Sequence, residues 1–146
     1  MLFRSVAPEV IAAAEADTDT DRKAAAGLAA KLMEKTRPAT GNAYLTRKGF
    51  PALECLTLTA LHKTGGVTFR AGDVVVPLHD GTGALVNLQL INFDGLKRTL
   101  KGGAVKGTCH IIEGQKQAGK RLWIAEGYAT ALTVHHLTGE TVMVAL

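Results

Sequence analysis

The N-terminal part of the chain has the residue pattern of helices. Residues 8–16 are rich in alanine with a proline near their start, which favours a short helix that ends at the acidic run 17–21. A second helix is predicted from about residue 21 to residue 35, because apolar residues recur there at helical spacing, at Ala25, Leu28, Ala29, Leu32 and Met33. We therefore expect a helical region over residues 1–40, and the segment 37–41 predicts a connection.

Beyond residue 66 the pattern changes to short β-rich runs bounded by Gly and Asp. These runs cover residues 67–69, 74–78, 84–93 and 96–100. Asp-Gly pairs between them favour tight turns, since glycine adopts positive φ readily. We expect an antiparallel meander.

Toward the C-terminus the pattern is strand, helix, strand. Residues 122–125 are a compact apolar run, 128–137 have helical content, and 141–146 are apolar and β-branched. Such a βαβ unit implies two parallel neighbours. The predicted class is α+β, with a helical region (1–40), a mostly antiparallel basic subdomain (41–118) and a βαβ unit (119–146).

The charge of the chain is unevenly distributed. The formal net charge is +4, yet residues 1–21 carry five acidic side chains and one basic one, so the remainder carries +8 (16 basic minus 8 acidic). Such an excess favours a polyanionic partner such as nucleic acid.

Cys55 and Cys109 stand alone, without the spacing of a disulfide framework or a structural zinc site. No signal-peptide core or long apolar stretch is found. We expect a soluble protein of a reducing cytoplasm, with no membrane partner.

Glu126, Gly127 and Tyr128 follow the apolar run 122–125, at a strand end where α/β sheets place catalytic groups. A carboxylate at this point suits Mg²⁺ binding or proton transfer. Alternatively, Glu126 is a helix-N-terminal glutamate that the helix dipole favours.

The segment 94–121 carries a local charge of +5, seven basic residues against two acidic ones, interleaved with glycines. Basic side chains and exposed backbone N–H groups of this kind can contact phosphates, and the candidates are Lys97, Arg98, Lys101 and Lys106. A solvated lysine-rich hairpin edge is the alternative.

Residues 44–50 place an aromatic ring beside two cations, so Tyr44, Arg47 and Lys48 are candidates for stacking and charge contacts with a nucleic-acid strand. The alternative is a loop whose Tyr44 and Leu45 pack on neighbouring structure. No Ser-His-Asp order, Walker lysine loop or dinucleotide-binding glycine motif is present.

Taken in their order along the chain, the three segments 44–50, 94–121 and 126–128 resemble the phage and plasmid (conjugation-type) primase family, whose members carry a Toprim domain. The resemblance covers roughly residues 40–146. Its motifs are Tyr-Leu-Thr-Arg-Lys-Gly at 44–49, a valine-proline-leucine to glutamine stretch at 76–89, Asp-Gly-x-Lys-Arg at 94–98, Gly-Gly-x-x-Lys-Gly at 102–107, and Glu-Gly-Tyr at 126–128.

The chain departs from the family pattern at several points. Asn42-Ala43 stand where the family often has His-Pro, the upstream zinc-binding element is missing, and the chain ends before the Asp-x-Asp of a Toprim metal site. We therefore expect a fragment that stops inside the Toprim core and that is inactive alone.

The resemblance implies a DNA-directed RNA polymerase of the primase type in the full-length parent. Glu126 would bind Mg²⁺ or act as general base, while Lys97, Arg98 and Lys106 would neutralise triphosphate or template charge. The implied partners are a single-stranded DNA template, nucleoside triphosphates and a replicative helicase or helicase domain. The alternatives are a non-catalytic single-stranded-DNA-binding or replication-partner module and, more distantly, a Toprim nuclease or topoisomerase relative.

Overall fold

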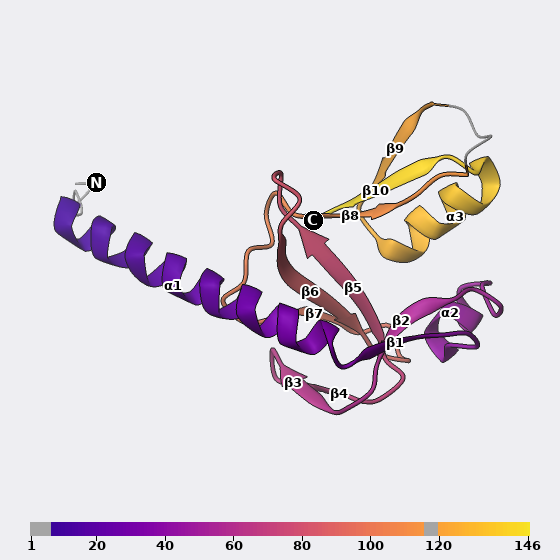
Figure 1. Ribbon diagram of the computed structural model, residues 1–146, viewed down its shortest axis with the longest axis horizontal. Coiled ribbons are helices and arrows are strands. Elements are labelled where there is room, and N and C mark those ends of the chain that lie inside the picture. The colour runs from indigo at the N-terminus through magenta and orange to yellow at the C-terminus, as the bar shows by residue number, and fades with distance from the viewer. Residues whose placement is uncertain (1–6, 116–119) are drawn as a thin grey trace, which may run out of the picture.

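The computed structural model describes residues 7–115 and 120–146. A long helix precedes a mostly antiparallel sheet and a C-terminal strand–helix–strand unit, which confirms the predicted α+β class (Figure 1). In chain order the elements are α1 (Pro8–Met33), β1 (Thr36–Ala39), α2 (Ala43–Arg47), β2 (Cys55–Leu58), β3 (His62–Thr64), β4 (Val67–Phe69), β5 (Val74–His79), β6 (Leu85–Ile91), β7 (Lys97–Thr99), β8 (Cys109–Ile112), β9 (Leu122–Ala125), α3 (Tyr128–Thr138) and β10 (Thr141–Ala145). No helix within these described ranges is both long and apolar enough to cross a lipid bilayer.

Eight of the strands form one sheet. β1, β2, β5, β8, β10 and β9 follow one another in it, and β6 and β7 branch from β5. β9 and β10 pair in parallel, as predicted for the βαβ unit, whereas the other pairs are antiparallel. The four strands predicted between residues 67 and 100 are confirmed as β4 to β7, although β4 pairs with β3 in a separate hairpin.

The prediction of two N-terminal helices was wrong, because α1 is continuous through the acidic run. The hydroxyl groups of Thr18 and Thr20 donate to the carbonyl oxygens of Ala14 and Ala16, four residues back, at 2.9 and 3.0 Å. These bonds satisfy both hydroxyls within the helix, and the acidic side chains of the run stay in solvent. The run therefore continues α1 and does not cap a second helix.

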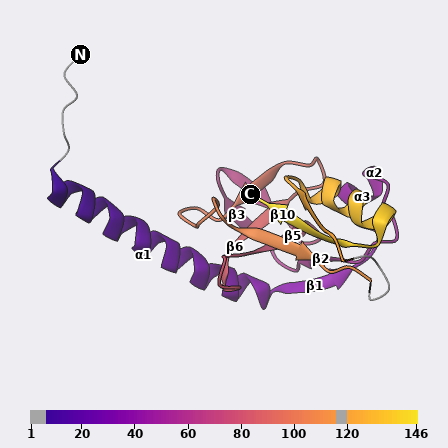
Figure 2. The same cartoon turned by 90° about the horizontal axis from the view of Figure 1, so that it is seen from above.

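Only the last turns of α1 pack on the sheet. Ala25, Ala29 and Leu32 are buried in a cluster that includes Leu88 and Leu90 of β6. The preceding turns project from the body of the molecule (Figure 2). We call residues 8–21 of α1 the projecting arm.

The segment 37–41 was predicted to be a connection, but residues up to 39 belong to strand β1. Pro38 is tolerated there because β1 lies at the end of the strand order and pairs only with β2. The strands β2, β3 and β8 were not predicted, and each is only three or four residues long.

The core has two parts, one on each side of the central strands. On β5, Val74 and Val76 face a cluster with residues of α2 and α3, whereas Val75 faces the cluster beneath α1. The continuous apolar run of β5 is explained by this burial on both sides.

Candidate nucleic-acid interface

Two of the sequence motifs form one cavity. α2 and the turn between β6 and β7 enclose about 550 Å³, lined by Tyr44, Arg47, Lys48, Asp94, Gly95 and Lys97. We call it the lysine cavity. The motifs at 44–49 and 94–98, far apart along the chain, therefore lie against one another.

Local structure around α2 positions its basic residues. The Asn42 side chain accepts a hydrogen bond from the N–H of Leu45 at 3.1 Å and donates one to the carbonyl of Gly72 at 2.8 Å. Tyr44 and Leu45 are buried, which anchors the helix in the core. Arg47 and Lys48 are exposed beyond them.

Tyr44 is 2% exposed, and its ring lies beside Gly95, where an added Cβ would be 3.4 Å from the ring. The Lys48 ammonium lies 5.7 Å from the centre of this ring. This placement favours the packing interpretation of Tyr44, because little of the ring is open to a base.

Lys97, in the lining of the lysine cavity, has a lowered pKa. Burial lowers the pKa of its ammonium below the ordinary value, and the positive charge of Lys48 lowers this pKa further. Among the described residues Lys97 forms no salt bridge. Two mutually repelling ammonium groups in one cavity form a site that a phosphate group would stabilise.

The third motif, residues 126–128, lies next to the lysine cavity. Glu126 is exposed at the end of β9, and Gly127 is the N-cap residue of α3. A Cβ added at Gly127 would lie 3.9 Å from Nζ of Lys97. α2 and α3 lie side by side at the end of the molecule opposite the projecting arm (Figures 1 and 2).

Tyr128, the last residue of this motif, is buried in the core. Its ring packs edge-on against His110 with ring centres 5.9 Å apart. Burial, with smaller contributions from Cys55 and Tyr44, raises the pKa of Tyr128 to about 12, so the hydroxyl is neutral at physiological pH. This residue supports the turn at Glu126 from beneath.

The remaining basic candidates lie elsewhere. Arg98 Nε donates to the carbonyl of Gly65 at 3.3 Å and Nη1 donates to the carbonyl of Lys97 at 2.8 Å, so this side chain packs on the β3–β4 hairpin. Lys101 and Lys106 are exposed in the loop between β7 and β8.

The glycine-rich loop that carries these lysines is built around Asn87. Its Oδ1 accepts from the N–H of Leu100 at 3.0 Å, and its Nδ2 donates to the carbonyl of Ala104 at 2.8 Å. A Cβ at Gly103 would lie only 2.5 Å from this Nδ2. Gly103 thus has a packing role, which the sequence did not indicate.

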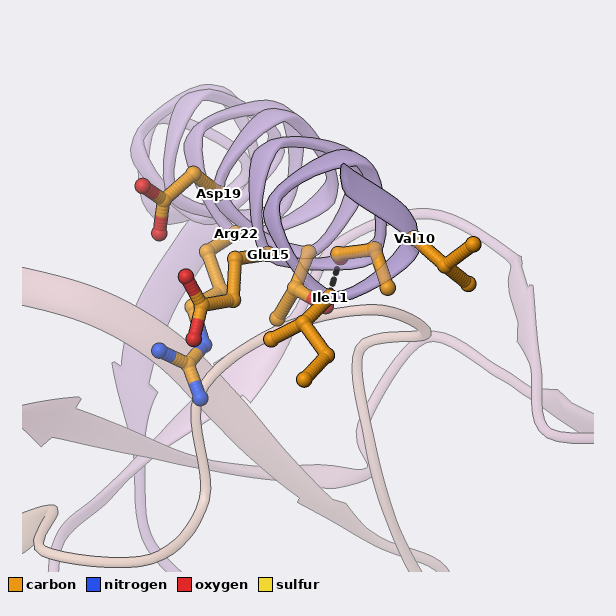
Figure 3. Close-up of a pocket in the computed structure, with 7 residues that line it drawn as sticks. Val10, Ile11, Glu15, Asp19 and Arg22 are labelled. Atoms are coloured by element: carbon orange, nitrogen blue, oxygen red, sulfur yellow. Dashed lines mark hydrogen bonds between the residues drawn. The ribbon is translucent and has the colours of Figure 1, made fainter. Parts of the chain in front are cut away.

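Another cavity, of about 590 Å³, lies along the projecting arm and away from all three motifs (Figure 3). Glu15 and Asp19 line it with a single arginine, Arg22, and with Val10 and Ile11. Its acidic lining does not suit a polyanion.

Magnesium fits the described residues only in part. Glu126 supplies one exposed carboxylate, and Mg²⁺ is usually held by one or two carboxylates together with substrate phosphates. Within residues 7–115 and 120–146 no group of three or more His, Cys, Asp or Glu could hold a metal ion.

The chain is 31% identical to the DNA primase TraC of Escherichia coli over 134 residues, which cover 84% of this chain. It spans only 13% of that primase. No protein-family profile matches the chain, and no solved structure matches it. Over most of its length, the chain is thus related in sequence to a DNA primase.

Proposed function

We propose that this chain is the template- and nucleotide-contacting part of a DNA primase that makes RNA primers on single-stranded DNA during phage or plasmid replication. The observation that carries the proposal is the placement of Lys97, which lines one cavity with Lys48 and whose Nζ lies next to Gly127, the residue after Glu126. The relationship to a DNA primase supports the same function.

Within this proposal, residues 119–146 begin a Toprim domain and residues 41–118 form its basic subdomain. Glu126 would act in nucleotidyl transfer, as a Mg²⁺ ligand or as general base toward the attacking 3′-hydroxyl, in a full-length protein that supplies an Asp-x-Asp. Lys97, Lys48 and Arg47 would neutralise the phosphates of the template or the incoming nucleotide. Arg98, Lys101 and Lys106 would extend the basic surface.

The binding part of the proposal is tested with the chain itself and fluorescently labelled single-stranded DNA. Lys97→Ala should weaken binding across sequences and reduce the slope of log K against log salt by about 0.7, the value for one lost phosphate contact on a single strand. Lys63→Ala is the matched control, because Lys63 is an exposed lysine on the β3–β4 hairpin outside the cavity. Equal effects of the two substitutions would contradict the proposal.

The catalytic part is tested in a longer chain that includes the expected Asp-x-Asp. There Glu126→Gln should abolish primer synthesis and leave DNA binding nearly intact, because the amide keeps the shape of the side chain and loses its charge. Primer synthesis at the normal rate by this variant would show that Glu126 is structural.

A non-catalytic single-stranded-DNA-binding module is the second candidate, since the lysine cavity needs no completed metal site to bind phosphate. The two functions are separated by the same longer chain. DNA binding without primer synthesis, in the presence of Mg²⁺ and nucleoside triphosphates, would favour the binding module.

A further inference from the structure

A second cavity lies beside the lysine cavity and has no role in the function proposed above. It encloses about 400 Å³ between β1, the start of α2 and the turn before β5, which is within the range of about 300–1,000 Å³ found for small-ligand sites. Arg37, Arg70 and Phe93 contribute its two cations and its aromatic ring. We call it the arginine cavity.

The two cations of the arginine cavity form no salt bridge in the described part of the chain, although burial raises the pKa of the Asp73 carboxyl and the charge of Arg70 acts against this larger effect. Both Arg37 and Arg70 are exposed, and neither guanidinium forms a salt bridge with a described residue. The acidic residue in the lining, Asp73, is 8% exposed and accepts a hydrogen bond from the backbone N–H of Arg70 at 2.8 Å. The cavity therefore keeps an excess of positive charge suited to phosphate.

Phe93 is a 56% exposed aromatic side chain on a rigid turn. The N–H of Gly95 donates to the carbonyl of Asn92 at 2.9 Å, and the N–H of Leu96 donates to Oδ1 of the same asparagine at 2.9 Å. Gly95 has φ of +87°, which closes this tight hairpin. An exposed phenylalanine alone is ordinary on a surface, but here it borders a cavity with two arginines.

The two cavities are lined by neighbouring residues at two places. On the β6–β7 turn, Phe93 lines the arginine cavity and the next residue, Asp94, lines the lysine cavity. On α2, Ala43 lines the arginine cavity and Tyr44 lines the lysine cavity. Since consecutive Cα atoms are about 3.8 Å apart, the two cavities lie next to each other at both places.

We infer that the arginine cavity is a second subsite for single-stranded nucleic acid, in which Phe93 stacks on a base while Arg37 and Arg70 contact the flanking phosphates. This inference rests on the proposed function. It adds a second binding position for the nucleic-acid strand, next to the lysine cavity. A planar base suits the exposed ring because stacking tolerates any sequence.

Binding of a short labelled oligothymidylate and of an abasic oligomer of the same length tests the stacking contact. Phe93→Ala should weaken binding of oligothymidylate about five- to a hundredfold and leave binding of the abasic oligomer unchanged, because only the first has bases to stack. Phe93→Tyr should restore binding. Leu61→Ala, which removes a 63% exposed apolar side chain outside both cavities, should change neither affinity.

The arginines are tested on the same two oligomers. Arg37→Ala and Arg70→Ala should weaken both oligomers alike, each reducing the salt slope by about 0.7. Unchanged slopes, or an equal effect of Phe93→Ala on both oligomers, would overturn the subsite. If Lys97→Ala weakens binding and Phe93→Ala does not, the subsite is wrong and the proposed function stands; if the unmodified chain binds neither oligomer, both are wrong.

Discussion

At the scale of single residues, the partly buried charge of Lys97 is unfavourable for the fold. Its pKa is lower in the folded chain than in the unfolded chain, so the folded state disfavours the proton and stability rises with pH just below 10.5, the ordinary pKa of lysine. We therefore expect Lys97→Met to raise the free energy of unfolding at pH 7, by less than about 1 kcal/mol because the group is partly solvated. Urea unfolding measures this effect.

The same variant should bind single-stranded DNA more weakly, so stability and binding change in opposite directions. Lys63→Met is the control, since Lys63 is exposed and should show neither effect. A Lys97→Met variant that is less stable than the unmodified chain would contradict this prediction. The ammonium would then stabilise the fold.

The sequence motifs indicated the individual residues of the lysine cavity. They did not indicate that these residues lie together in the folded chain. Lys48 and Lys97 each stand in a basic run that predicts phosphate contacts, yet spacing along the chain carries no information on contacts between segments this far apart. Arg37, Arg70 and Phe93, which line the arginine cavity, were not predicted as site residues because they stand in separate segments without a common pattern. Phe93 in addition falls in a strand-like apolar run, which sequence reasoning assigns to the sheet.

At the scale of elements, the edge strand β9 that precedes Glu126 pairs with β10 and is also anchored by one buried carboxylate. Glu140, 3% exposed, accepts hydrogen bonds from Nε1 of Trp123 and, at 3.4 Å, from Nε of Arg121. The bond from Trp123 and then the charge of Arg121 lower the pKa of this carboxyl below its ordinary value of 4.5. Glu140 thus contributes stability that is present above pH 4.5 and is lost as the pH falls through the folded-state pKa.

Glu140→Gln should destabilise the chain at pH 7, and the difference from the unmodified chain should shrink as the pH is lowered toward 3. Trp123 is the single tryptophan, so its emission during denaturant titrations at each pH reports directly on this strand. Glu113→Gln, at an exposed position after β8, is the matched control. A pH-independent loss of stability in the Glu140 variant would assign its role to packing and not to charge.

The sequence pattern predicted several elements, including the short strands β4, β7 and β9, but it missed other short strands and divided α1 into two helices. β5, β6 and α3 have enough residues for a pattern of burial to show, and their predicted positions are confirmed. β3 and β8, with three and four residues, are too short for a period. α1 continues through the acidic run, where the Thr18 and Thr20 hydroxyls bond backward along the helix, whereas composition alone favoured a break.

At the scale of the whole molecule, the acidic projecting arm and the lysine cavity lie at opposite ends (Figures 1 and 2). The projecting arm carries all five acidic side chains of residues 1–21, while residues 22–146 carry +8. The arm extends away from the sheet, and its side chains are exposed. Its field therefore opposes the approach of a polyanion from a distance without touching either cavity.

Neutralising the arm should strengthen DNA binding at low salt. We expect the combined substitution of Glu15→Gln, Asp17→Asn and Asp19→Asn to raise affinity for single-stranded DNA by up to about tenfold, at the lower limit of electrostatic steering effects. The gain should vanish at high salt, because exposed charges are screened beyond about 3 Å at 1 M. Asp21 is left unchanged because its side chain packs against the loop at Gly102.

The charge-conserving combination of Glu15→Asp, Asp17→Glu and Asp19→Glu is the matched control for this last prediction. It changes the same three exposed positions and keeps their charge, so its affinity should equal that of the unmodified chain at every salt concentration. Circular dichroism of both variants checks that α1 remains helical. An equal gain in both variants, or a gain that persists at high salt, would show that the arm acts through contact with the DNA and not through its field.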